Sequence, residues 1–152
     1  EGSSKNLKSY DMVPLLFISL TIIAGTFVSG MDAGLVYNTF PYMGDSIIPI
    51  EYGNLGFIDP FENPVTAQFH HRLLASITLI IIILYSINYM IKNSVNLRVL
   101  LLLFAIVCQF IIGIFTLLYS VPITLGAMHQ FGGVLLFLSA LWLLHSPKKN
   151  TF

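Results

Sequence analysis

The stretch LRVLLLLFAIVCQFIIGIFTLLY, residues 97–119, decides the fold, because Arg98 at its start is its one charged residue. A membrane-crossing α-helix needs about 20 mostly apolar residues at a rise of 1.5 Å each. This stretch meets that length, and its centre is uncharged. It therefore predicts a transmembrane helix.

Three further stretches, 12–30, 65–91 and 123–145, satisfy the same criterion. The whole chain is 56% hydrophobic and 9% charged, with a mean hydropathy of +0.84, whereas a soluble domain carries about 25% charged residues. We therefore expect an all-α integral membrane protein, a single domain over residues 1–152 built as a four-transmembrane-helix bundle. The lipid bilayer is its solvent. The zero formal charge argues against a nucleic-acid partner.

Basic residues predict the orientation of the bundle, because cytoplasmic or matrix loops collect Lys and Arg. Most Lys and Arg residues lie next to span ends that fall on one side of the membrane. Six of the seven basic residues fall on that side, namely Lys5, Lys8, Lys92, Arg98, Lys148 and Lys149, whereas Arg72 lies within a span toward the opposite side. The acidic segment 31–63 falls on the opposite side. The protein is expected in a bacterial cytoplasmic membrane or a mitochondrial inner membrane, with both termini on the cytoplasmic or matrix side. Residues 1–8 are polar and lack an initiator Met, so we expect the chain to begin within a longer polypeptide.

The segment 31–63 is too long for a simple turn between bundle helices, where about 2–8 residues are usual. Pro41, Pro49 and Pro60 stiffen it, and several aromatic residues suit the headgroup level. We interpret it as an outer lid between the first and second spans, containing a short interfacial helix.

Two of the four histidines occupy matched positions in the second and fourth spans. His71 and His129 each lie about two turns into their helix, roughly 10 Å from its start at 1.5 Å per residue. These helices run in the same direction and are diagonal in an up-down bundle, so two imidazoles can approach one metal from opposite sides. Ionisable residues within a span are costly and suggest function. We predict that His71 and His129 are the axial ligands of one haem iron.

Small residues flank both histidines at helical spacing. Ala67 and Ala75 share the face of His71, and Gly126, Gly132 and Gly133 share that of His129. They leave space for a flat ring close to the backbone. The alternative is that they only allow close helix packing, as small residues do in membranes.

Two polar neighbours of His71 are candidates for contact with the cofactor. Arg72 suits a bidentate interaction with a haem propionate, the alternatives being snorkelling to the headgroups or pairing with Glu62. Gln68 shares the face of His71 and could hydrogen-bond the ligand or the haem edge.

The remaining candidates are assigned to packing. His70 points about 100° away from His71, and His145 falls at the inner interface. Met43 and Met128 are treated as packing residues, and Cys108 has no partner for a disulfide. No nucleophile–base pair or paired carboxylates occur within the spans, so the residues suggest redox chemistry rather than hydrolysis.

Several runs of sequence resemble the C-terminal half of haem A synthase, in the same order and over about residues 10–146. They are GTFVSGMDAG (25–34), NTFPYMG (38–44), FENP (61–64), QFHHR (68–72), VP (121–122) and MHQ (128–130). The resemblance implies one of two pseudo-symmetric four-helix halves of an oxidoreductase. That enzyme oxidises the C8 methyl of haem O to a formyl group, giving haem A for cytochrome oxidase.

In that family the C-terminal half holds haem b through one histidine of each even-numbered helix, which corresponds here to His71 and His129. The family's N-terminal half receives haem O and carries a Glu-x-x-His motif with a catalytic carboxylate. This chain has Gln68 in place of that glutamate and Ala75 in place of a common glycine. The resemblance therefore implies the cofactor half, with no catalytic residue to name and little activity on its own.

Two functions follow from these observations. The first is the haem b half of a haem A synthase, with haem O as substrate in a missing half and with haem O synthase and an electron donor as partners. The second is a stand-alone bis-histidine membrane cytochrome that only carries electrons. Both predict ligation by His71 and His129, and an upstream Glu-x-x-His helix would distinguish them. A third possibility, a structural or transport bundle without cofactor, predicts a purified protein with no Soret band.

Overall fold

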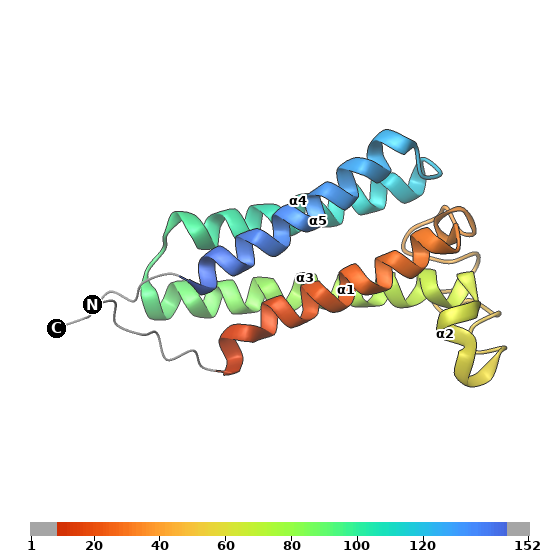
Figure 1. The fold of residues 1–152 in the computed structure, drawn as a ribbon, viewed down its shortest axis with the longest axis horizontal. Coiled ribbons are helices and arrows are strands. Elements are labelled where there is room, and N and C mark those ends of the chain that lie inside the picture. The colour runs from red at the N-terminus through yellow and green to blue at the C-terminus, as the bar shows by residue number, and fades with distance from the viewer. Residues whose placement is uncertain (1–8, 146–152) are drawn as a thin grey trace.

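The computed structural model describes residues 9–145, which form a bundle of long helices with an irregular segment at one end (Figure 1). The long helices are α1 (Val13–Gly30), α3 (Pro64–Asn93), α4 (Leu97–Leu118) and α5 (Ile123–Leu144). Each is long and apolar enough to cross a membrane. The predicted fold class is therefore confirmed, with helix ends that differ by one or two residues from the predicted spans. Lys5, Lys8, Lys148 and Lys149 lie outside the described residues.

Polar residues fix where two of these helices begin. The side chain of Asn63 accepts a hydrogen bond from the backbone N–H of Val65, and Pro64 occupies the first helical position of α3, where no N–H is needed. The side chain of Asn96 accepts from the backbone N–H groups of Arg98 and Val99 at the start of α4. The starts of α3 and α4 are therefore set by side-chain caps as well as by hydropathy.

The four long helices pack as two antiparallel pairs. One pair is α1 with α3 and the other is α4 with α5, and the pairs meet where α3 contacts α4 and α1 contacts α5. Helices α3 and α5 are thus diagonal, as the sequence predicts. The pairs are close together at the end of the α3–α4 connection and diverge toward the other end (Figure 1).

The hydrophobic core occupies the end where the two pairs are close. All four long helices contribute to it, and its most buried side chains are Ile18, Ile82, Val99, Leu102 and Leu143. Side chains from both pairs fill this end. The divergent end is left with space that aliphatic packing does not occupy.

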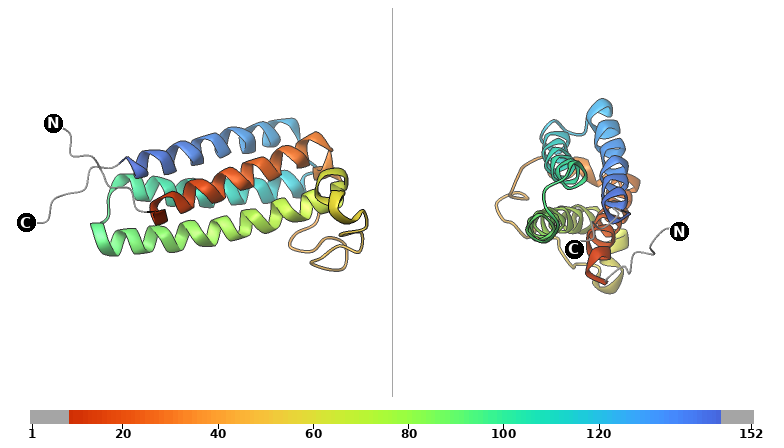
Figure 2. Two further views of the ribbon diagram at one scale, coloured as in Figure 1. Left: turned by 60° about the horizontal axis from the view of Figure 1, so that its bottom comes forward. Right: turned by 90° about the vertical axis from the view of Figure 1, so that its left-hand side faces the viewer.

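The segment between α1 and α3 folds over the divergent end (Figure 2). We call residues 31–63 the lid segment. It contains two short 3₁₀ helices, η2 (Ala33–Leu35) and η3 (Gly56–Ile58), and the short helix α2 (Asp59–Glu62). Four hydrogen bonds converge on the buried carboxylate of Asp59, from the backbone N–H groups of Gly53 and Leu55 and from the side chains of Asn63 and Thr66. The lid segment therefore has a polar core of its own.

Candidate functional site

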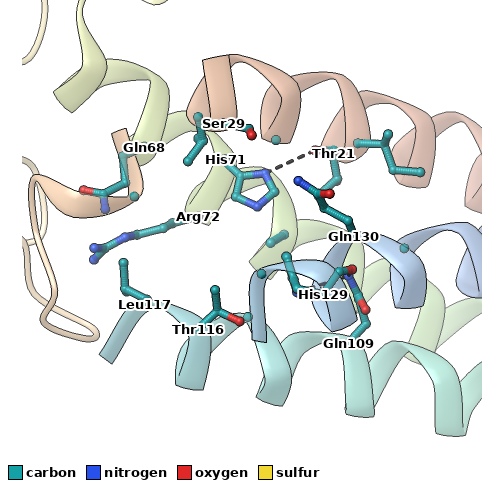
Figure 3. A pocket seen from close by; sticks show the side chains of 18 of the residues that line it. Thr21, Ser29, Gln68, His71, Arg72, Gln109, Thr116, Leu117, His129 and Gln130 are labelled. Carbon is teal, nitrogen blue, oxygen red and sulfur yellow. Dashed lines mark hydrogen bonds between the residues drawn. The ribbon is translucent and has the colours of Figure 1, made fainter. Parts of the chain in front are cut away.

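A cavity of about 850 Å³ lies between the two helix pairs, on the lid side of the hydrophobic core. Its wall contains residues of all four long helices and of the lid segment. This volume is within the range of about 300–1,000 Å³ typical of small-molecule sites. All four predicted site residues, Gln68, His71, Arg72 and His129, line it (Figure 3).

The two histidines face each other across this cavity from the diagonal helices α3 and α5. The centres of the His71 and His129 rings are 6.3 Å apart, with the rings nearly perpendicular at 85°. A metal–imidazole bond is about 2 Å, so two rings that bind one metal ion on opposite sides have centres about 6.4 Å apart. The separation of the rings therefore fits a single iron atom between them.

The ring of His71 is held by the backbone of α1. Its Nδ1 lies 3.1 Å from the carbonyl oxygen of Thr21, and a carbonyl can only accept a hydrogen bond. In the neutral imidazole the proton is therefore on Nδ1, and Nε2 keeps the lone pair that a metal needs. Figure 3 shows this contact as the dashed line between His71 and Thr21.

The ring of His129 has a side-chain partner instead. Gln109 of α4 places its Nε2 3.2 Å from His129 Nδ1 and 2.7 Å from the carbonyl oxygen of His129. Gln109 also lines the cavity. The role of Gln109 is not predicted from the sequence, because nothing in the pattern of α4 shows that Gln109 and His129 meet.

Each histidine ring also lies against a glycine of the helix paired with its own. A Cβ atom built on Gly25 of α1 would be 3.1 Å from Cε1 of His71, and one on Gly113 of α4 would be 2.8 Å from Cε1 of His129. Any side chain at either position would push against the ring. These glycines are not predicted from the sequence, because the rings that they face belong to other helices.

The small residues that flank the histidines have mixed roles. Ala75, Gly126 and Gly133 line the cavity, as the sequence predicts. Ala67 is buried outside the cavity wall. Gly132 lies so close to Gln109 that a Cβ would collide with its side-chain oxygen. For these last two residues the prediction of space for a ring was wrong, because their faces are covered by other protein atoms.

Arg72 and Gln68 connect α3 to the lid segment. The guanidinium of Arg72 donates to the carbonyl oxygens of Tyr37 at 2.7 Å, Thr39 at 2.9 Å and Tyr42 at 3.4 Å. The side-chain N–H of Gln68 donates to the Tyr37 carbonyl at 3.0 Å. In the part of the chain that the structure describes, Arg72 Nε and Gln68 Oε1 are buried and have no hydrogen-bond partner.

The histidines assigned to packing lie away from the cavity wall. The Nε2 of His70 is 3.2 Å from the hydroxyl of Tyr52 in the lid segment. His145 follows the last residue of α5, where its Nδ1 is 2.9 Å from the carbonyl oxygen of Leu141. Neither contact turns these rings toward the cavity.

The donor set favours a porphyrin-bound metal over a bare ion. Within residues 9–145 no group of three or more His, Cys, Asp or Glu side chains is placed to hold a metal ion, whereas protein sites for bare zinc use three or four ligands. A haem supplies four nitrogens of its own and requires one or two axial ligands from the protein. Two opposed imidazoles in a large apolar cavity fit that requirement.

Comparison with known proteins identifies relatives over almost the whole chain. A family described as cytochrome oxidase assembly protein matches residues 2–141. A protein of Wolbachia pipientis named haem A synthase is 38% identical over 97% of this chain and 42% of its own length. Proteins of the same name from Granulibacter bethesdensis and the mouse are 41% and 39% identical, over 92% and 87% of this chain.

The chain is much shorter than these relatives. It spans 37% of the Granulibacter protein and 33% of the mouse protein. No solved structure matches it.

Proposed function

The chain belongs to the cytochrome oxidase assembly protein family, and we propose that it is the haem b-binding half of a haem A synthase. In this proposal the complete enzyme oxidises the C8 methyl of haem O to a formyl group, giving haem A for cytochrome oxidase. The observation that carries the proposal is the 6.3 Å separation of the His71 and His129 ring centres across the cavity. The names of the relatives, which are haem A synthases, support the reaction.

The residues of this chain have distinct tasks in the proposal. His71 and His129 would hold the haem iron, and a haem held there would supply one-electron redox chemistry. The apolar helices exclude water from the site and hold the two rings at a fixed separation. Among the described residues, Gln68 Oε1 and Arg72 Nε are buried without a hydrogen-bond partner. These two atoms are therefore available to hydrogen-bond the edge of the bound group.

The substrate chemistry is assigned to another part of the polypeptide. Gln68 stands one helical turn before His71, and an amide cannot act as the general base that a carboxylate provides. We therefore infer that this half relays electrons while haem O binds in a second four-helix half. Haem O synthase and an electron donor are its proposed partners, and the acidic lid segment is proposed to lie on the outer side of the membrane.

The proposal is tested by visible spectroscopy of the detergent-purified protein that carries this chain. The parent protein should show a low-spin, six-coordinate haem spectrum, because two imidazoles fill both axial positions. His71→Ala and His129→Ala should each remove the absorbance of this haem or convert it to a high-spin form. The measurement is the haem content per protein together with the Soret and α-band positions.

His70→Ala is the matched control, since His70 is adjacent to His71 but contacts Tyr52 of the lid segment. It should retain the parent haem content. Unchanged haem spectra in both the His71 and the His129 variants would overturn the ligand assignment.

A further inference from the structure

The side chain of Gln109 is held between α4 and α5 by contacts on several sides. It reaches from α4 to His129 and lies against Gly132 and Gly133 of α5, where a Cβ on Gly132 would collide with its Oε1. The two glycines thus provide the space in which the amide sits. Its Nε2 contacts both the ring and the backbone of His129, while Oε1 is buried without a partner among the described residues.

The two histidines consequently differ in how their Nδ1 atoms are held. Thr21 presents a backbone carbonyl to His71, and this group accepts a hydrogen bond whatever the ligand state of the ring. Gln109 presents an amide to His129, and an amide can turn either a donor or an acceptor toward the ring. His71 is therefore fixed as a metal ligand, whereas the state of His129 depends on its neighbour.

The orientation seen here favours the non-ligating state of His129. With Nε2 of Gln109 donating to Nδ1, the ring proton is on the histidine's own Nε2, the atom that would face the iron. Ligation requires the proton on Nδ1, and a metal-bound histidine almost always donates that N–H to an acceptor. Half a turn of the amide brings Gln109 Oε1 to the ring and supplies the acceptor.

That half turn has a cost. The Nε2 of Gln109 donates to the His129 carbonyl at 2.7 Å, and after the turn two oxygens would face each other there. The amide must move away from the carbonyl to relieve their repulsion. This cost opposes the iron–His129 bond and has no counterpart at His71.

We propose that Gln109 is a positioning residue for His129, and that the orientation of its amide determines whether His129 binds the iron and how strongly. This inference rests on the proposed function, because it requires a haem between His71 and His129. Its chemical consequence is an asymmetric pair of ligands, with a fixed bond to His71 and an adjustable bond to His129.

Two nearly isosteric variants test the proposal in the full-length protein. Gln109→Glu offers only acceptor atoms to His129 Nδ1, which makes the imidazole a stronger donor to iron and should lower the midpoint potential of this haem. Gln109→Met offers only a weak thioether acceptor, so the potential should rise. In the Met variant we also expect binding of His129 to iron to weaken by about 10–100-fold, the range for loss of such partners. Carbon monoxide can bind the reduced iron only where His129 has dissociated, so carbon monoxide binding measures this weakening.

Val107→Met is the matched control, because Val107 is on the same helix as Gln109 but is exposed and does not line the cavity. It should keep the parent potential and carbon monoxide reactivity. Equal shifts in the Gln109→Met and Val107→Met variants, or the parent potential in both Gln109 variants, would overturn the role of Gln109. If the Glu variant fails to accumulate, the Met variant decides alone. Failure of both, with normal accumulation of Val107→Met, would show that Gln109 serves packing only.

His129→Ala separates failure of this inference from failure of the proposed function. If His129→Ala leaves the haem spectrum unchanged, His129 is not a ligand and both proposals fail. If His129→Ala changes the spectrum while the Gln109 variants match the parent, the haem site stands and only the role of Gln109 is refuted.

Discussion

At the scale of single residues, the site depends on two glycines that give the histidine rings room. Gly25 lies against His71 and Gly113 against His129, each on the helix packed beside that of its histidine. Interiors as dense as those of proteins respond even to one added methyl group. The positions of the rings are therefore controlled from α1 and α4 as much as from the helices that carry them.

We predict that Gly113→Ala reduces haem content more than Gly25→Ala. The added methyl would stand 2.8 Å from the His129 ring but 3.1 Å from the His71 ring, so His129 must move further. Overpacking of this kind costs about 1–3 kcal/mol. The ratio of Soret absorbance to protein in the purified variants measures the effect.

Ala24→Ser is the control for this comparison, because it adds one atom beside Gly25 on α1 at a position that does not line the cavity. It should retain the parent haem content. Full haem content in Gly113→Ala would show that the His129 ring has free space on that side.

The sequence was sufficient to predict that His71 and His129 lie at one site, because matched depth in two spans is visible in the order of residues. Both line the cavity. It was not sufficient to select Gln109, Gly25 or Gly113, since their importance comes from contacts between different helices. The partner of His71 Nδ1 is a backbone carbonyl, which any residue at position 21 would supply. No sequence pattern can indicate such a contact.

At the scale of elements, hydropathy predicts the four spans to within one or two residues, whereas the interior of the lid segment could not be predicted. The hydroxyl of Tyr37 donates to the Glu51 carboxylate at 3.0 and 3.1 Å, and Arg72 of α3 donates to three carbonyls of the same segment. These are contacts between residues well separated along the chain. Hydrogen bonding to Glu51, then burial, raises the pKa of Tyr37 above its usual value.

We predict that the lid segment loosens as the pH falls from about 4 to about 2. Burial of Asp59 alone would raise its pKa, but the hydrogen bonds from Thr66, Asn63 and the Leu55 and Gly53 amides outweigh it and hold the pKa at about 2. An unfolded Asp has a pKa of about 3.9. The stabilisation is therefore complete above the unfolded pKa and is lost as the pH falls through the folded pKa. Pepsin cleavage within residues 31–63 across this pH range measures the loss.

Asp59→Asn should make the lid segment cleavable at every pH in this range, because an amide N–H₂ would face hydrogen-bond donors. Asp45→Asn is the control, since Asp45 is exposed in the same segment. Equal protection of the parent protein at pH 4 and pH 2 would contradict the role of Asp59.

At the scale of the whole molecule, the bundle separates packing from binding. The hydrophobic core fills the end near the α3–α4 connection, and the cavity occupies the end covered by the lid segment. Four apolar helices and membership of this family make the chain an integral membrane protein. The proposed orientation places the cavity nearer the outer surface.

Labelling of single cysteines tests that orientation. In a Cys108→Ser background, Asp45→Cys should react with a membrane-impermeant maleimide in intact cells, because the acidic lid segment is proposed outside. Val95→Cys, in the connection between α3 and α4, should react only after the membrane is permeabilised, since Lys92 and Arg98 favour the inner side. Both positions are exposed. The reverse pattern of labelling would refute the orientation.

The division into two helix pairs has a consequence for assembly. His71 belongs to the pair of α1 and α3, and His129 to the pair of α4 and α5. The connection at residues 94–96 does not line the cavity, so a polypeptide severed there would retain one imidazole on each fragment. An iron atom bound by both histidines would then link two separately made fragments. The affinity of the fragments for each other would depend on the supply of haem and not on a continuous backbone.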